Sequence, residues 1–280
     1  MRDLSQFSNS HDQLEIICHD HSSCVKKTFF SDIERAKRNV AKQRLFRPMY
    51  TGHARISAVE VLDFKIHQDR AELLMPYVEG ITGRTFLIHA TRNIAQILSK
   101  SISTLIYTEL NNSREEVVDL SLFECKIQNV ADLTDDRDLR SLVVRAMDKI
   151  TKLPLKMTFP IGSCHGDLTL NNIILDPSSG VTLIDFLDTY LETPLQDVAK
   201  LKQDFIYGWS FRKEPTSLGI KAKIFCRYHS PQAILQAERL YPRQVWLMTL
   251  MALVRIAPYV KDSVTKQWLE KSITHCLESD

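Results

Sequence analysis

Two short polar segments have residue types and a spacing that suit phosphate chemistry. The first carries Asp167 and, five residues later, Asn172, and the second is an apolar strand-like run that ends at Asp185. Because a loop that feeds a tight hairpin places these three side chains around one point, they can act together. In phosphoryl transfer one carboxylate orients the acceptor hydroxyl and takes its proton, while a second carboxylate and an amide hold Mg²⁺ against the phosphates.

Read singly, each segment could be an ordinary turn, but two ordered motifs at this separation favour a shared site. The pattern H-G-D-x-x-x-x-N, from His165 to Asn172, is followed by a strand that ends I-D-F, from Ile184 to Phe186. This order resembles the motifs of the aminoglycoside phosphotransferase and choline kinase family, which are themselves similar to the HRD and DFG elements of protein kinases.

The resemblance implies a role for each polar residue. Asp167 would be the catalytic base, and Asn172 and Asp185 would hold Mg²⁺. His165 would brace the loop, and Asp197 would support it from the start of a later helix. The run 164–208 also resembles phosphotransferase-domain proteins associated with bacterial surface-polysaccharide synthesis.

A lysine for the nucleotide phosphates is expected on the second strand of the small lobe, where the sequence reads Val25-Lys26-Lys27. Strand alternation places Val25 and Lys27 on one face and Lys26 on the other. Because an apolar side chain two residues before the lysine should line the adenine pocket, Lys27 is the better candidate. The alternative is that both lysines lie on the surface of an edge strand.

The segment 73–80 resembles the hinge between the two lobes of this superfamily, where backbone groups bind the purine. Met75 would lie beside the base, and Pro76 lacks an N–H but keeps a carbonyl that could accept from an adenine amino group. The N–H of Val78 could donate to a ring nitrogen. The alternative is a strand that ends at a turn.

Two features depart from the family pattern. A glycine-rich phosphate loop should precede Cys24, yet the first glycine is Gly52, so the turn over residues 8–12 is the only candidate. The helix acid that usually pairs with the lysine is also missing: Glu34 lies close behind Lys27, and Gln43 has a more suitable spacing but no charge. The partner of Lys27 is left open.

The order of elements predicts an α+β, two-lobed protein-kinase-like fold. Strands are expected over 13–18, 22–30, 56–64 and 71–75, with a helix over 33–46 that begins after Ser31-Asp32. Helices are expected over 86–110, 139–153, 246–256 and 268–277, and a hairpin over 173–175 and 181–184. We expect residues 1–79 to form a nucleotide-binding lobe with a small antiparallel sheet, and residues 80–280 to form a helical lobe with the catalytic loop and acceptor site.

Composition indicates an ordinary globular protein. The chain has 280 residues, 44% hydrophobic and 25% charged, with a formal net charge of +2. Its six cysteines are scattered and suit free thiols in a reducing compartment. The amino terminus lacks the apolar run of a signal peptide, so a cytoplasmic protein is expected. A nucleic-acid partner would depend on the basic helix alone and is not expected.

The predicted function is the Mg²⁺-dependent transfer of the terminal phosphate of ATP or GTP to a hydroxyl of a small acceptor, such as a sugar or amino alcohol. Asp188, Glu192 and Asp204 are expected to line the acceptor site. An aminoglycoside-modifying kinase and a pseudokinase-like binding or scaffold protein are the alternatives. A protein kinase is less expected, because Gly166 replaces the arginine of HRD.

Overall fold

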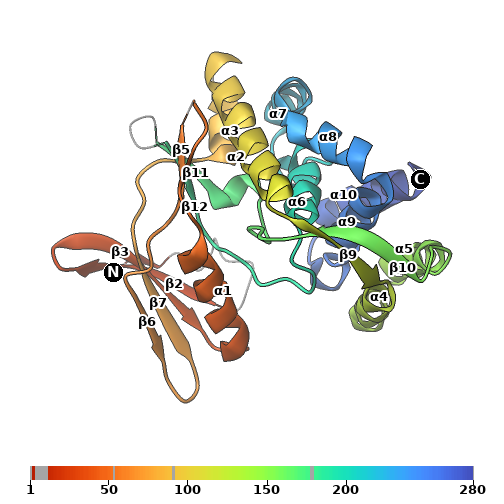
Figure 1. Cartoon of the computed structure of the whole chain (residues 1–280), viewed down its shortest axis with the longest axis horizontal. Coiled ribbons are helices and arrows are strands. Elements are labelled where there is room, and N and C mark those ends of the chain that lie inside the picture. The colour runs from red at the N-terminus through yellow and green to blue at the C-terminus, as the bar shows by residue number, and fades with distance from the viewer. Residues whose placement is uncertain (1, 4–11, 53, 90–91, 177–179, 280) are drawn as a thin grey trace.

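The computed structural model describes residues 2–3, 12–52, 54–89, 92–176 and 180–279. In Figure 1 strands β2, β3, β6 and β7 and helix α1 lie at the lower left, and helices α4 to α10 lie on the right. An antiparallel sheet followed by a helical region confirms the predicted α+β arrangement. No helix in the described ranges combines the length and apolar character needed to cross a membrane.

The amino-terminal sheet is antiparallel throughout and has the order β1-β2-β3-β7-β6. Its hairpin joins β2 and β3 through Asp20 and His21, whose positive φ angles of 47° and 63° are typical of a two-residue turn that suits the right-handed twist of the strands. Strand β7 pairs with β3 and places Leu73 opposite Lys27. The strand bounds are β1 (Arg2–Asp3), β2 (Gln13–His19), β3 (Ser22–Phe29), β6 (Asp63–Ile66) and β7 (Ala71–Pro76).

Helix α1 (Ile33–Leu45) follows β3 and begins where the sequence predicts, because the Asp32 carboxylate accepts the N–H of Arg35 at 3.0 Å. One face of the helix is buried against the sheet through Ala36 and Val40. Arg38, Asn39 and Lys42 of the same helix contact residues 187–192 in the later half of the chain. The helix therefore connects the small sheet to the segment that follows Asp185, as described below.

A second, mixed sheet joins the two halves of the sequence in the order β4-β5-β12-β11-β8. The single strand predicted over 56–64 is wrong: β5 ends at Ala58, β6 begins at Asp63, and β5 pairs in parallel with β12. Burial of Ile56 in the larger core accounts for this placement. The division at residue 79 stays a prediction, and β5 precedes it but pairs with β12, which follows it. The bounds are β4 (Met49–Tyr50), β5 (Arg55–Ala58), β8 (Ile81–Thr82), β11 (Ile173–Asp176) and β12 (Gly180–Leu183).

The helical region packs around α6 and α9, with residues 245–254 of α9 all buried. The helix predicted over 86–110 is two helices, α2 and α3. Helix α4 and the two-stranded antiparallel sheet of β9 and β10 were not predicted. The bounds are α2 (Gly83–His89), α3 (Arg92–Asn111), β9 (Arg114–Asp119), α4 (Ser121–Leu133), α5 (Arg137–Ile150), β10 (Lys156–Ile161), α6 (Pro194–Phe205), α7 (Thr216–His229), α8 (Gln232–Leu240), α9 (Pro242–Val254) and α10 (Ser263–Glu278).

Candidate active site

Helix α6 holds the loop that carries Asp167 through hydrogen bonds to the loop backbone. The fully buried carboxylate of Asp197 accepts the backbone N–H of His165 at 2.5 Å and that of Gly166 at 2.8 Å. The Gln196 amide donates to the Gly166 carbonyl at 3.2 Å. Burial raises the pKa of Asp197 to about 7 against the opposing effect of these N–H groups. Asp197 thus holds the backbone of the loop that carries Asp167, and its predicted role in catalysis stays a prediction.

The ring of His165 links the loop to the strand before Asp185. Nε2 donates to the Ile184 carbonyl at 2.9 Å, and Nδ1 accepts the N–H of Asp167 at 3.2 Å. The ring also packs on Phe186, with centroids 4.3 Å apart. Burial lowers the pKa of His165 to about 4, so the imidazole is neutral near pH 7 and fits the expected bracing role.

Gly166 allows the two motif segments to approach each other closely. Its φ is 90°, and a Cβ at this position would lie 2.0 Å from the carbonyl oxygen of Leu187. The N–H of Leu187 donates to the His165 carbonyl at 3.0 Å, which fixes the approach. The glycine of the H-G-D pattern is therefore explained by backbone packing between residues 165–167 and 185–187.

We expect Gly166→Ala to destabilise the fold strongly for two reasons. The added methyl group would clash with the Leu187 backbone, and alanine disfavours the positive φ at this position. The loss in free energy of unfolding should exceed about 3 kcal/mol, measured by urea denaturation. Gly208→Ala is the matched control: Gly208 has φ 74° but no atom within 4 Å of the added Cβ, so its loss should be about 1–2 kcal/mol. Equal losses in the two variants would contradict the packing argument.

Both carboxylate oxygens of Asp167 have a partner. Oδ2 accepts the Asn172 amide at 3.0 Å, and Oδ1 lies 3.0 Å from Nζ of Lys200. The Asn172 amide nitrogen also donates to the Asp167 backbone carbonyl at 2.8 Å, so its oxygen is the atom that could serve the predicted metal-binding role. Burial alone would raise the pKa of Asp167, but the Lys200 ammonium and the Asn172 amide outweigh it and hold the pKa below its ordinary value. Asp167 is thus an oriented carboxylate at neutral pH.

Asp185 lies beside this group and faces the amino-terminal sheet. Its φ of 61° is left-handed, a conformation uncommon for a non-glycine residue and frequent at functional sites. Lys27 Nζ lies 2.6 Å from Oδ1 of Asp185, so β3 and the I-D-F segment meet as the sequence predicts. The backbone N–H of Ile184 donates to the Asn172 carbonyl at 3.0 Å, which links the two predicted magnesium ligands through adjacent backbone.

Neither helix residue considered for Lys27 is its partner. Gln43 is buried inside the small lobe, where its amide donates to the Val59 carbonyl at 2.9 Å and contacts Met75 Sδ at 3.5 Å. Glu34 pairs with Lys37 on the same helix. The carboxylates near Lys27 are instead Asp185 and, at 3.5 Å, Asp12, and their charges raise its pKa although burial opposes them.

The predicted hinge is the end of β7, directly beside the strand of Lys27. Met75 and Pro76 lie opposite Val25 and Cys24 in the β3–β7 pairing. Val78 follows the strand and packs against the core of the small lobe, as do Val25 and Ile184. The purine-binding role of this segment stays a prediction. In the predicted phosphate turn, residues 8–11 lie outside the described residues.

The three acids expected to line an acceptor site are all engaged elsewhere. Asp188 accepts from Arg38 Nε at 2.8 Å, and Glu192 lies 2.7 Å from Lys42 Nζ. Asp204 is fully buried and accepts the backbone N–H groups of Leu170 at 2.6 Å and Ser210 at 2.9 Å. The prediction for Asp204 is therefore corrected: a carboxylate enclosed by backbone donors positions the loop and cannot form the wall of an acceptor site.

Lys42 joins α1 to the segment after Asp185. Its Nζ donates to the Leu187 carbonyl and to Oε1 of Glu192, each at 2.9 Å, and lies 2.7 Å from Oε2 of Glu192 and 3.4 Å from Cys164 Sγ. Arg38 and Asn39, one turn earlier on α1, bind Asp188 through its carboxylate and its N–H. Helix α1 supplies no acid to Lys27, and it contacts the segment after Asp185 through Arg38, Asn39 and Lys42.

We expect Lys42→Met to lower the free energy of unfolding by about 2 kcal/mol, because it removes the ammonium that the Leu187 carbonyl accepts from and that balances the Glu192 charge, although Thr189 still donates to Glu192. Lys37→Met is the matched control on the same helix, since Lys37 is half exposed and pairs only locally with Glu34. Its loss should be within about 0.5 kcal/mol. Urea denaturation of both variants measures the difference, and losses of equal size would show that the contact between helix and segment contributes nothing.

Lys200 is a site residue that the sequence reading missed. It lies three residues after Asp197 on α6, a spacing that places both side chains on one helix face. That periodicity was the available signal.

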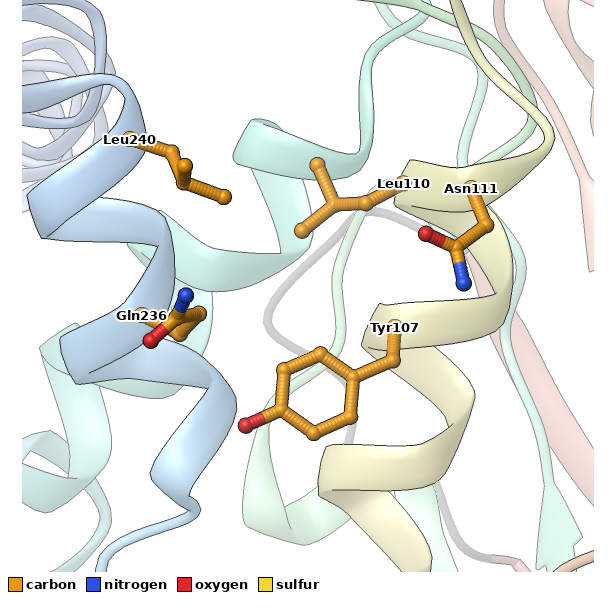
Figure 2. A pocket seen from close by; sticks show the side chains of 5 residues that line it. All are labelled: Tyr107, Leu110, Asn111, Gln236 and Leu240. Atoms are coloured by element: carbon orange, nitrogen blue, oxygen red, sulfur yellow. The ribbon is translucent and has the colours of Figure 1, made fainter.

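A pocket of about 360 Å³ lies between α3 and α8 and has no lining residue in common with the site. Tyr107, Leu110, Gln236 and Leu240 face one another there (Figure 2).

The comparisons with known proteins agree with this geometry. A family model described as the phosphotransferase enzyme family (APH) matches residues 33–220, more than half of the chain. Aminoglycoside phosphotransferase APH(4)-Ia is similar in structure, with a TM-score of 0.62 and 14% identity over 99% of this chain and 93% of that chain. No curated protein sequence matched.

Two further solved structures share the fold. A thermostable APH(4)-Ia mutant in a ternary complex with ADP and hygromycin B has a TM-score of 0.60 and 14% identity, over 99% of this chain and 93% of that chain. Choline kinase LicA from Streptococcus pneumoniae has a TM-score of 0.54 and 16% identity, over 96% of this chain and 90% of that chain. The protein-kinase-like fold and the resemblance drawn from the motifs are both confirmed, and the chain belongs to the phosphotransferase enzyme family.

Proposed function

We propose that the chain transfers the terminal phosphate of ATP or GTP to a hydroxyl group of a small molecule. The observation that supports this most is the meeting of Lys27 and Asp185 at 2.6 Å, beside the Asp167–Asn172 pair at 3.0 Å. A phosphate-binding cation, metal-binding oxygens and a proton acceptor are then present in one group. Family membership makes a small-molecule kinase the expected class of enzyme.

In this proposal Asp167 orients the acceptor hydroxyl and accepts its proton as the new P–O bond forms. The bond between the terminal phosphorus and its bridging oxygen breaks, and the nucleoside diphosphate leaves. Lys27 binds the nucleotide phosphates from β3, and the end of β7 at Met75, Pro76 and Val78 receives the purine. His165 and Asp197 keep the loop in place without contacting the reacting atoms.

Magnesium fits the donor set of this site. Mg²⁺ prefers a few hard oxygen ligands and retains several waters, so the Asp185 carboxylate and the Asn172 amide oxygen are sufficient when phosphates complete the shell. Among the described residues there is no group of three or more His, Cys, Asp or Glu side chains placed to hold a metal ion alone. A Mg²⁺ ion that binds together with the nucleotide phosphates would need only these two protein ligands. When bound, it would neutralise charge on the phosphates.

A sugar or amino alcohol is the proposed acceptor, and a neutral sugar is favoured over a polycationic aminoglycoside. Asp188 and Glu192 already pair with Arg38 and Lys42, and Asp204 is enclosed in the core. A polycation needs unpaired carboxylates, and these three do not offer them.

A pseudokinase-like binding role has one observation in its favour, namely that α1 supplies no acid to Lys27.

Thermal unfolding in the presence of ligands tests this proposal. A nucleotide that binds the native state should raise the melting temperature, and saturation at about 100 times Kd adds about 2.7 kcal/mol of stability. ATP and GTP are compared with and without Mg²⁺, followed by hexoses, choline, ethanolamine and hygromycin B in the presence of ADP. We expect a Mg²⁺-dependent shift with one nucleotide and a further shift with one acceptor class. No shift with either nucleotide would contradict the proposal.

A further inference from the structure

Lys200 lies at the point where the acceptor hydroxyl must bind. Its Nζ is 3.0 Å from Oδ1 of Asp167, and its side chain is only 16% exposed. For proton transfer a hydroxyl must lie about 2.6–3.2 Å from the same carboxylate. The attacking oxygen and the phosphorus that it approaches would therefore lie within reach of the lysine ammonium.

The two partners of Asp167 differ in how firmly they are held. Asn172 is fixed, because its amide also binds the Asp167 carbonyl and its own carbonyl accepts the N–H of Ile184. Lys200 reaches Oδ1 from α6 on a flexible four-carbon stem that carries a compact charge. An arriving hydroxyl can therefore take the place of Lys200 on Oδ1, while Asn172 keeps the carboxylate oriented.

A displaced ammonium would remain close to the phosphoryl group. Charge spreads over the three equatorial oxygens of that group during transfer, and a cation placed there stabilises the transition state more than the ground state. The surroundings exclude much of the solvent, so the interaction is stronger than in water. Lys27 and the metal ligands approach the phosphates from the nucleotide side, whereas Lys200 approaches from the side of Asp167.

We propose that Lys200 is a further catalytic residue, which holds Oδ1 of Asp167 in the resting site and binds an oxygen of the transferred phosphoryl group during reaction. This role depends on the proposed phosphotransfer. It is distinct from that of Asp197, three residues earlier on α6, which binds only backbone N–H groups of the loop.

Lys202 provides a matched control. It lies on the same helix, has a side chain 13% exposed, and pairs with Glu238 of α8 at 2.5 Å. Substituting either lysine by Met removes one ammonium from α6 and one ion pair. A general effect of charge or helix stability should therefore be equal in the two variants, whereas a contact with the phosphoryl group belongs to Lys200 alone.

The test is calorimetric binding of Mg²⁺–ADP with and without aluminium fluoride, which mimics the phosphoryl group in transfer. We expect aluminium fluoride to lower the Kd of ADP in the wild type and in K202M. In K200M the ratio of the Kd without fluoride to the Kd with fluoride should be about 10²-fold smaller than in the wild type. The affinity of K200M for ADP alone should remain within about threefold of wild type. K200R keeps the charge and should recover most of the tightening.

The outcomes separate this inference from the function on which it depends. A wild type that binds no ADP at all would overturn the proposed phosphotransfer and, with it, the role of Lys200. Tightening in K200M equal to that in the wild type would overturn the role of Lys200 alone. Parallel losses of ADP affinity and melting temperature in K200M and K200R would likewise overturn it, because they indicate a purely structural contact.

Discussion

Asp167→Asn is expected to lower kcat by about 10²–10⁴-fold while nucleotide affinity is nearly unchanged. The amide cannot accept the acceptor proton. Its single oxygen can still accept from Lys200, and Asn172 loses its bond to Oδ2 but keeps its donation to the backbone carbonyl of residue 167. The nucleotide is bound by Lys27, the metal ligands and the end of β7, none of which is altered. Initial rates with the acceptor identified by thermal shift, together with the Kd for the Mg²⁺–nucleotide complex, measure both quantities.

Asp148→Asn is the control for this variant, because Asp148 is an exposed aspartate on α5 remote in sequence from both motifs. Its kcat and Kd should equal those of the wild type. If D167N loses nucleotide affinity to the same degree as turnover, Asp167 acts in binding and not as the proton acceptor. If D167N retains full kcat, the assignment of the base is wrong.

Asp185→Asn should weaken the binding of the Mg²⁺–nucleotide complex by about 10–100-fold, which corresponds to about 1.4–2.7 kcal/mol. Asparagine tolerates the left-handed φ of 61° at this position, so the backbone should persist. The loss arises because an amide is a weaker magnesium ligand than a carboxylate. Calorimetric titration of the nucleotide with and without Mg²⁺ measures the effect.

The metal dependence separates this prediction from a general loss of binding. Nucleotide affinity without Mg²⁺ should change little or improve in D185N, since Lys27 loses the negative charge of its 2.6 Å partner and keeps only Asp12 at 3.5 Å as a nearby carboxylate. A wild type and a D185N variant with the same Kd in Mg²⁺ would show that Asp185 does not hold the metal. Equal weakening with and without Mg²⁺ would contradict the assignment as well.

The sequence predicted the part of the site that depends on local spacing. The separation of Asp167 from Asn172, and the strand that ends before Asp185, indicated a loop and hairpin that the structure contains. Strand alternation separated Lys27 from Lys26, and the structure pairs Lys27 with Asp185 and Lys26 with Glu15. These features follow from periodicity over a few residues.

What the sequence did not predict depends on contacts between distant segments. The parallel pairing of β5 with β12, and the attachment of Lys42 to Glu192, join positions more than 100 residues apart. Asp204 had the composition of a binding residue, yet backbone donors from two loops enclose it. Lys200 belonged to a recognisable helix, but only the tertiary structure brings its ammonium to Asp167.

The central claim is tested most directly by transfer of label from ATP or GTP carrying ³²P in the terminal phosphate. Wild type and D167N are incubated with Mg²⁺ and the acceptor classes named above, and nucleotide binding is verified in the same samples. The account predicts a labelled phosphomonoester of one acceptor class with the wild type and a signal reduced by about 10²-fold or more with D167N. Equal labelling by the two proteins, or nucleotide binding without any labelled product, would contradict it.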